Sequence, residues 1–298
     1  IGTSSLAVGN RCLHLRHGFG AFLSQHRTDP RLGVQGADLL AAGHSAAEAM
    51  AVVVQAPDIG WRQLAALDNH GLISPLSEKL TLMNPGSLGG ANWGGGAMLG
   101  AGPVLITNVN NVPLTGRLIP LASGAAAESR KRDHPAAGHR MQVTMQGTPY
   151  NIEIGSLQSF LGIPCNPPPW GMLHAVDAQS GEIRWEVPLG MLQDLVKVPT
   201  PRRWGSPNLG GAIITGDLVF IGATMDRRFR AFDLQTGDMV WETKLPASAQ
   251  ATPLTYRARP DGRQFVVIAA GGHSSLMSTL GDYVVAFALP EDRPEEDR

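Results

Sequence analysis

The sequence predicts an all-β protein of the β-propeller class, preceded by an irregular or partly helical N-terminal segment. Two observations favour this class: a strand–turn–strand pattern that occurs twice with matched residues, and apolar strands that recur along the second half of the chain. Glycine (36 residues) and proline (22 residues) are also abundant, as in folds built from short strands and tight turns. Repeated strand-rich units of this kind are the sequence signature of propeller blades.

The matched pattern reads AVDAQSGEIRWEVPLG at residues 175–190 and AFDLQTGDMVWETKLP at residues 231–246. In each copy an apolar stretch leads to an aspartate, a glycine ends the turn, and an alternating stretch leads to a tryptophan, which predicts a β-hairpin. The aspartate can accept hydrogen bonds from turn amides, and the glycine permits a positive φ where the chain reverses. Trp185 and Trp241 occupy equivalent positions and are predicted to pack against the neighbouring blade.

A second element recurs beside these hairpins. Residues 210–224 (GGAIITGDLVFIGAT) are similar to residues 95–108, and shorter apolar strands follow at residues 265–271 and 283–290. Strand-rich units of about 40–55 residues, each with its own hairpin, leave room for about four blades between residues 84 and 290. The alternative interpretation is a pair of hairpins in another β-sandwich.

The composition excludes several classes of protein. Hydrophobic residues make up 43% and charged residues 16% of the 298 residues, which indicates a globular chain. The formal net charge of −1 gives no electrostatic basis for binding nucleic acid or an anionic membrane. Cys12 and Cys165 lie far apart with no metal-ligand spacing. The sequence contains no run of 18 apolar residues and no basic region followed by an apolar stretch, so neither a membrane span nor a signal peptide is indicated.

Residues 1–70 differ in character from the rest of the chain. They contain no hairpin repeat, and their Ala-rich stretch at residues 37–56 predicts a helix. We interpret residues 1–70 as an unmatched segment that is partly disordered or is translated from a shifted reading frame. Residues 291–298 are predicted to form a charged, solvated tail. Residues 1–70 also hold five of the nine histidines, which have no metal-binding spacing: His14, His17, His26, His44 and His70.

Three motifs in the remaining portion, residues 71–290, together resemble one protein family. They are SLGGANWGG (87–95), GIPCNPPPWG (162–171) and GDYVVAFALP (281–290), in this order. This portion resembles the C-terminal region of the pyrroloquinoline-quinone (PQQ)-dependent dehydrogenases of the membrane-associated glucose and quinate/shikimate type. The resemblance implies an eight-bladed propeller, of which this chain would supply about four blades.

The resemblance also implies a redox function. PQQ would lie close to a calcium or magnesium ion and accept a hydride from a sugar, polyol or cyclic alcohol, while a carboxylate removes the hydroxyl proton. Electrons would then pass to a quinone or a cytochrome. The family implies a periplasmic location, with membrane association only through parts outside this chain.

Asn92 and Trp93 of the first motif are the residues that the resemblance assigns to the cofactor. An amide can donate a hydrogen bond to a quinone or carboxylate oxygen, and an indole can stack on a ring. The alternative for Trp93 is a structural wedge. Gly210 and Gly211 are further cofactor-binding candidates, with a purely structural role at the start of a strand as the alternative. His273 is predicted to be an exposed loop histidine, with contact to the substrate as the alternative.

The catalytic residues remain unassigned at this level. In the family, the proton-abstracting aspartate, the cation at the quinone oxygens and the metal-ligand carboxylates belong to earlier blades, and residues 1–70 show no match to them. No metal ligand is therefore assigned, and the chain is expected to be a fragment of an oxidoreductase that is inactive alone. The alternative function is a non-catalytic propeller that serves as a binding or assembly scaffold.

Overall fold

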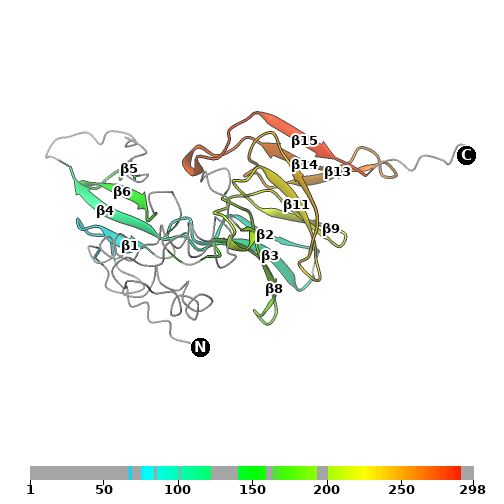
Figure 1. Ribbon diagram of the computed structural model, residues 1–298, viewed down its shortest axis with the longest axis horizontal. Helices are drawn as coiled ribbons and strands as arrows, with labels where there is room; N and C mark the ends of the chain where they lie inside the picture. Colours follow the sequence, from blue (N-terminus) through cyan, green and yellow to red (C-terminus); the bar gives the residue numbers. More distant parts are fainter. Residues whose placement is uncertain are drawn as a thin grey trace, which may run out of the picture. The chain divides into compact units, whose positions relative to one another are not determined.

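Four antiparallel sheets make up most of the computed structural model (Figure 1). The described part of the chain otherwise contains loops and two short 3-10 helices, η3 (Arg202–Trp204) and η4 (Ser274–Leu276), which confirms the all-β prediction. The helix expected at residues 37–56 and the tail at residues 291–298 lie outside the described residues. The structure describes residues 67–68, 75–83, 86–100, 102–121, 140–158, 164, 166, 168–192 and 201–289.

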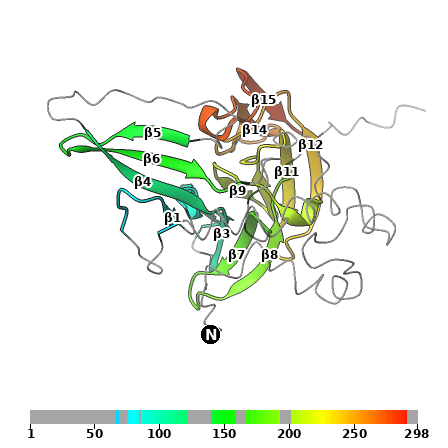
Figure 2. The ribbon, with the colours of Figure 1, turned by 60° about the vertical axis from the view of Figure 1, so that its left-hand side comes forward.

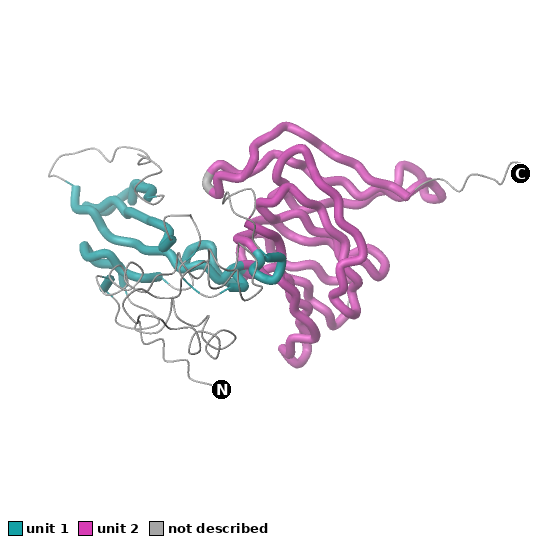
Figure 3. Tube along the Cα trace, viewed as in Figure 1, with its two compact units in different colours: residues 1–90, 110–170, 196–205 teal, residues 91–109, 171–195, 206–298 magenta. Residues whose placement is uncertain are grey.

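The chain divides into two compact units (Figure 3). Unit 1 comprises Ile1–Gly90, Asn110–Trp170 and Val196–Gly205. Unit 2 comprises Ala91–Val109, Gly171–Leu195 and Ser206–Arg298.

Unit 2 is built from three sheets, which we call blades A, B and C. Blade A has the order β2 (Gly90–Met98), β3 (Val104–Asn110), β7 (Gly171–Asp177) and β8 (Ile183–Pro188). Blade B has the order β9 (Ala212–Thr215), β10 (Leu218–Ile221), β11 (Arg228–Asp233) and β12 (Met239–Lys244). Blade C has three strands in the order β13 (Leu254–Arg257), β14 (Gln264–Ala270) and β15 (Tyr283–Phe287).

Blade B packs between the other two blades (Figures 1 and 2). Its Val219 and Ile221 belong to a buried cluster with Leu173 of blade A. The intervening residue of the same strand, Phe220, packs against a second cluster that includes Ile268 of blade C. Because side chains alternate along a strand, one sheet can bury both faces in this way, and stacking of successive sheets is the packing of a propeller.

The two predicted hairpins are present as β7–β8 and β11–β12, each with the same turn. Asp177 accepts hydrogen bonds from the backbone N–H groups of Gln179 (2.9 Å) and Ser180 (3.0 Å), and Asp233 makes the equivalent pair in the other hairpin. The turn glycines have positive φ angles of 77° (Gly181) and 76° (Gly237). The sequence interpretation of these residues is therefore confirmed.

Both repeat tryptophans contact the following blade, as predicted. The indole Nε1–H of Trp185 donates to the carbonyl oxygen of Leu234 at 3.0 Å, and its ring lies so close to Gly237 that a Cβ there would sit 2.7 Å from it. Trp241 packs edge-on against Phe287 of blade C, with 5.2 Å between ring centroids. These contacts join the outer strand of blade A to blade B and the outer strand of blade B to blade C.

In the first hairpin, Arg184 lowers the pKa of Asp177. The guanidinium of Arg184 donates two hydrogen bonds to Asp177 and, together with the turn amides, lowers the pKa of this carboxyl group to about 2. We predict that Arg184→Gln raises the pKa of Asp177 toward its ordinary value of 3.8, as measured by NMR titration. Since the folded-state pKa is depressed, the turn is stabilised at neutral pH, and this contribution is lost as the pH falls from about 4 towards 2. Asp233, whose pKa is lowered by the turn amides and by the side chain of Thr236 and not by an arginine, serves as the control and should not change.

Unit 1 contains a fourth sheet of different construction. It has the order β1 (Thr81–Met83), β4 (Leu114–Pro120), β6 (Tyr150–Ser156) and β5 (Arg140–Thr144). Buried Glu153 receives two hydrogen bonds from Arg117, at 2.9 and 3.1 Å, and one from Arg140 at 3.0 Å. Three of its strands come from the segment between β3 and β7, so the sheet is an insertion within blade A and not a further meander of the repeat.

Candidate functional site

Several loops of unit 2 lie at the same end of the blades. In an antiparallel sheet the first strand begins where the second strand ends, so the segment before a blade and the link between its second and third strands share one end. In blades B and C these segments are residues 206–211, 222–227, 247–253 and 271–282. We call this end of unit 2 the loop end.

Asn92 and Trp93 lie on β2 of blade A. The side-chain oxygen of Asn92 accepts a hydrogen bond from the backbone N–H of Trp93 at 2.7 Å. The Trp93 side chain is 63% exposed, in contrast to the buried Trp170 and Trp204. A large exposed indole beside an amide is therefore available to a ligand.

Gly94, the next residue, is in direct contact with the other two predicted site residues. A Cβ on Gly94 would lie 1.9 Å from the carbonyl oxygen of Gly210, and one on Gly211 would lie 2.4 Å from the carbonyl oxygen of Gly94. Gly210 has φ +116° and its α-carbon faces the carbonyl oxygen of Gln250. The structure thus brings Asn92 and Trp93 together with Gly210 and Gly211, which are more than a hundred positions away in the sequence. This tight backbone packing also accounts for the glycines without a ligand.

A pair of buried amides lies next to this contact and was missed by the sequence analysis. Asn208 donates to the carbonyl oxygens of Val109 and Ser206, each at 3.3 Å, and its Oδ1 accepts from Nδ2 of Asn108 at 2.5 Å. These contacts fix both amides, and within the described part of the chain they leave Oδ1 of buried Asn108 without a hydrogen-bond partner. A buried acceptor of this kind favours a bound donor. The available signal was the position of Asn108 on the same face of β3 as Ile106, which is fully buried.

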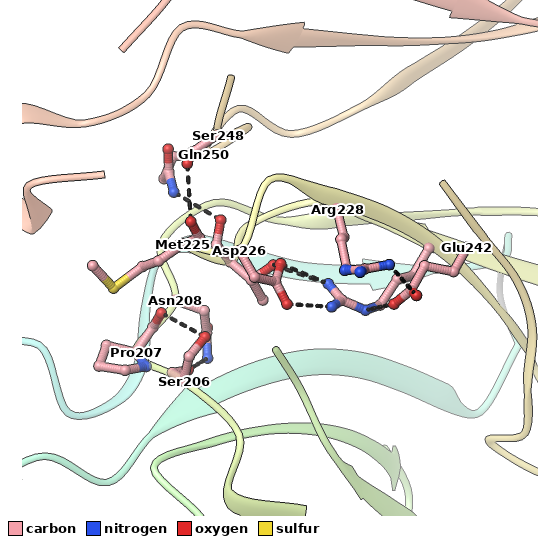
Figure 4. A network of polar contacts seen from close by, with 11 residues as sticks. Ser206, Pro207, Asn208, Met225, Asp226, Arg228, Glu242, Ser248 and Gln250 are labelled. Atoms are coloured by element: carbon pink, nitrogen blue, oxygen red, sulfur yellow. Dashed lines mark hydrogen bonds and ion pairs between the residues drawn. The ribbon is translucent and has the colours of Figure 1, made fainter. Parts of the chain in front are cut away.

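A buried charge network, also missed, supports the loop between β10 and β11 (Figure 4). Asp226 pairs with Arg230 and accepts a hydrogen bond from the hydroxyl of Thr224 at 2.6 Å. Arg230 also donates to Thr224 (2.9 Å) and to Glu242 (3.0 Å). Arg228 binds the same glutamate at 2.6 Å. Every charge in the network therefore has an opposite partner.

His273, at the start of η4, is half-buried rather than exposed. Its backbone N–H donates to the hydroxyl of Ser278 at 2.8 Å. Across the residues that the structure describes, no group of three or more His, Cys, Asp or Glu side chains is placed to hold a metal ion. The same residues include no helix that is long and apolar enough to cross a membrane.

Comparison with known proteins decides the family. Residues 26–266 match the family described as "PQQ: Glucose/ethanol/alcohol dehydrogenase, beta-propeller domain". The chain belongs to this PQQ dehydrogenase family. The match begins at residue 26, within residues 1–70. The interpretation of residues 1–70 as partly disordered or frame-shifted stays a prediction.

Three relatives illustrate the similarity. The chain is 40% identical over 233 residues to quinoprotein glucose dehydrogenase A of Acinetobacter calcoaceticus, covering 76% of this chain and 28% of that protein. It is 40% identical over 229 residues to quinoprotein glucose dehydrogenase of Escherichia coli (strain K12), covering 75% of this chain and 28% of that protein. It is 38% identical over 232 residues to the probable quinate dehydrogenase (quinone) of Xanthomonas campestris pv. juglandis, covering 74% and 28%. The predicted family is confirmed, and the chain spans 28% of the length of these relatives.

Proposed function

We propose that this chain is the C-terminal portion of a PQQ-dependent oxidoreductase that oxidises a CH–OH group of a sugar, polyol or cyclic alcohol. Family membership and relatives named as glucose and quinate dehydrogenases support this proposal. The longer protein would pass electrons to a quinone or cytochrome in the periplasm. The observation that supports the role of this chain is the contact of Gly94, the residue after Trp93, with Gly210 and Gly211.

The residues at this contact fit one edge of a PQQ site. The exposed Trp93 offers a flat apolar surface to a planar ring. Asn92 supplies an amide next to it. Gly210 and Gly211 adjoin this pair through their backbone contact with Gly94. When bound, PQQ supplies a quinone that accepts two electrons from the alcohol. In this proposal the catalytic base and the calcium or magnesium ligands belong to the longer protein, outside this chain.

We predict that Trp93→Ala weakens the binding of PQQ about tenfold, the equivalent of an aromatic stacking contact of about 1.4 kcal/mol. The measurement is a titration of the chain, and of the longer protein, with PQQ in the presence of calcium, followed by tryptophan fluorescence. Trp93→Phe should retain binding but lose most of the quenching. Trp241→Phe is the control, because Trp241 packs between blades and should leave both affinity and quenching unchanged.

Activity separates the proposal from a scaffold function. Dye reduction with glucose, quinate or short alcohols should occur with the longer protein and not with this chain alone. If neither protein shows PQQ binding that depends on Trp93, the cofactor edge is not at this contact. If the longer protein also oxidises no alcohol, the non-catalytic scaffold becomes the better explanation.

A further inference from the structure

The segment before β13 is unusually buried for a loop. Its side chains pack at the loop end of unit 2, between the 222–227 loop on one side and the 271–282 loop on the other. Exposed fractions fall between 0% and 4% for Ala247, Ser248, Ala249 and Gln250. A buried loop must find partners for its polar groups, and Gln250 uses both ends of its amide to do so.

On one side, Gln250 holds a strained turn. Its Nε2 donates to the carbonyl oxygen of Thr224 at 3.1 Å. The preceding residue, Ala223, has φ +61°, and the N–H of Thr224 donates back to Gly222 at 2.7 Å. A non-glycine residue in such a γ-turn is strained and persists only where its surroundings hold it. The N–H of Ala223 donates to the carbonyl oxygen of Ala249 at 2.6 Å and completes the support.

On the other side, Gln250 holds the loop that carries His273. Its Oε1 accepts from the hydroxyl of Ser278 at 3.3 Å, and this hydroxyl accepts from the backbone N–H of His273 at 2.8 Å. Ser248, two residues earlier, binds the same loop through its backbone, accepting from Gly272 and donating to Thr279. The backbone oxygen of Gln250 also faces Gly210.

We propose that Gln250 is a positioning residue that couples three parts of the loop end: the 222–227 turn, the 271–282 loop and the glycine contact at Gly210. Its importance for ligand binding rests on the proposed function, whereas its hold on the two loops does not. Gln250 touches no ligand in this proposal. It acts by fixing the loops around Gly210, which contacts Gly94 next to Trp93.

The first test is amide hydrogen exchange without any ligand. Gln250→Met keeps the volume and removes both hydrogen bonds, so exchange should rise about tenfold at residues 222–225 and 271–279, as expected for the loss of about 1.4 kcal/mol. Exchange at the centres of β11 and β14 should not change. Gln264→Met is the matched control, because Gln264 donates to Thr215 and Thr255 on the blade surface and should leave both loops unaffected.

A second variant separates hydrogen bonding from packing. An ionised carboxylate cannot donate to the carbonyl oxygen of Thr224, whereas a protonated carboxyl group both donates and accepts, as an amide does. Gln250→Glu should therefore show fast loop exchange at pH 8 and recover wild-type protection near pH 5, each compared with the wild type at the same pH. The other ionisable groups in or near these loops are common to both proteins and cancel in this comparison; they include Asp226, Arg227, Arg230, His273 and Asp282.

The outcomes are distinct from those for the proposed function. Unchanged loop exchange in Gln250→Met, or no recovery of Gln250→Glu at low pH, would overturn the positioning role. If Gln250→Met fails to fold, Ser278→Ala removes one of the two Gln250 side-chain bonds together with the Ser278–His273 bond. Residues 271–279 should then loosen and residues 222–225 should not; no loosening at 271–279 counts against the role. A wild-type chain and longer protein that bind no PQQ would reject the cofactor edge, while the exchange results would still decide the role of Gln250. If Gln250→Met loosens the loops yet binds PQQ as tightly as the wild type, the coupling to the ligand is wrong.

Discussion

Replacing Arg230 by leucine is expected to lower the free energy of unfolding by about 3–5 kcal/mol, the usual cost of breaking a buried ion pair by removing one partner. The Arg230 side chain is 3% exposed, and its partners Asp226 and Glu242 are 2% and 12% exposed. Without the guanidinium, Asp226 keeps, within the described part of the chain, the hydroxyl of Thr224 as its side-chain donor. Two carboxylates would then remain buried with their charges poorly balanced.

Urea denaturation of the purified chain measures this effect. Arg184→Leu is the control, because its pair with Asp177 is at the surface, with the arginine side chain 38% exposed, and such pairs contribute at most about 1 kcal/mol. Adding Asp226→Leu to the Arg230→Leu variant should recover part of the lost stability, since it removes an uncompensated charge. Equal losses from Arg230→Leu and Arg184→Leu would contradict the structural role assigned to the network.

The hairpins could be read from the sequence because each depends on local chemistry. Asp177 and Gly181 lie within five residues of one another and define a turn by themselves. Trp185 and Trp241 recur at the same position in that local pattern, so their role in blade docking was also visible. The family motif singled out Asn92 and Trp93 for a similar reason, since both residues lie within one short stretch.

The network at Arg230 could not be read in this way. In the stretch RFRAFD, charged and aromatic residues alternate, which ordinarily predicts a strand with Phe229 buried and Arg230 in solvent. Blade B is covered on both faces, so the side chains on both sides of the sheet are buried. A buried arginine must then pair with acidic side chains instead of water. Those partners come from other strands and loops, and no local sequence pattern predicts them.

The same limit applies to the glycine contact and to the insertion. The need for glycine at Gly94 arises from the backbone of Gly210, and the hydrogen bonds of Asn108 depend on Asn208. The strand order β1-β4-β6-β5 of unit 1 likewise joins segments that no repeat connects. Sequence reasoning proposed individual candidate residues, whereas the contacts between distant segments required the tertiary structure.

Gly94→Ala is the second change for which we expect a large effect, a loss of about 3 kcal/mol in the free energy of unfolding. The added methyl group would lie 1.9 Å from the carbonyl oxygen of Gly210, so two backbone segments would have to separate. Backbone cannot move aside as the end of a flexible side chain can, and the displacement would pass to Gly210 and to the carbonyl oxygen of Gln250 behind it. The binding of PQQ should weaken with it.

Gly95→Ala is the matched control on the adjacent residue. Gly95 has φ +68° with no atom within 4 Å of an added Cβ, so its cost comes from the left-handed backbone alone and should be about 1 kcal/mol. The two variants therefore separate backbone strain from collision at neighbouring positions of one strand. Denaturation and PQQ titration should both rank Gly94→Ala as the more damaging. The opposite ranking would mean that β2 does not lie against Gly210, and Asn92 and Trp93 would then lose their connection to the second half of the proposed cofactor edge.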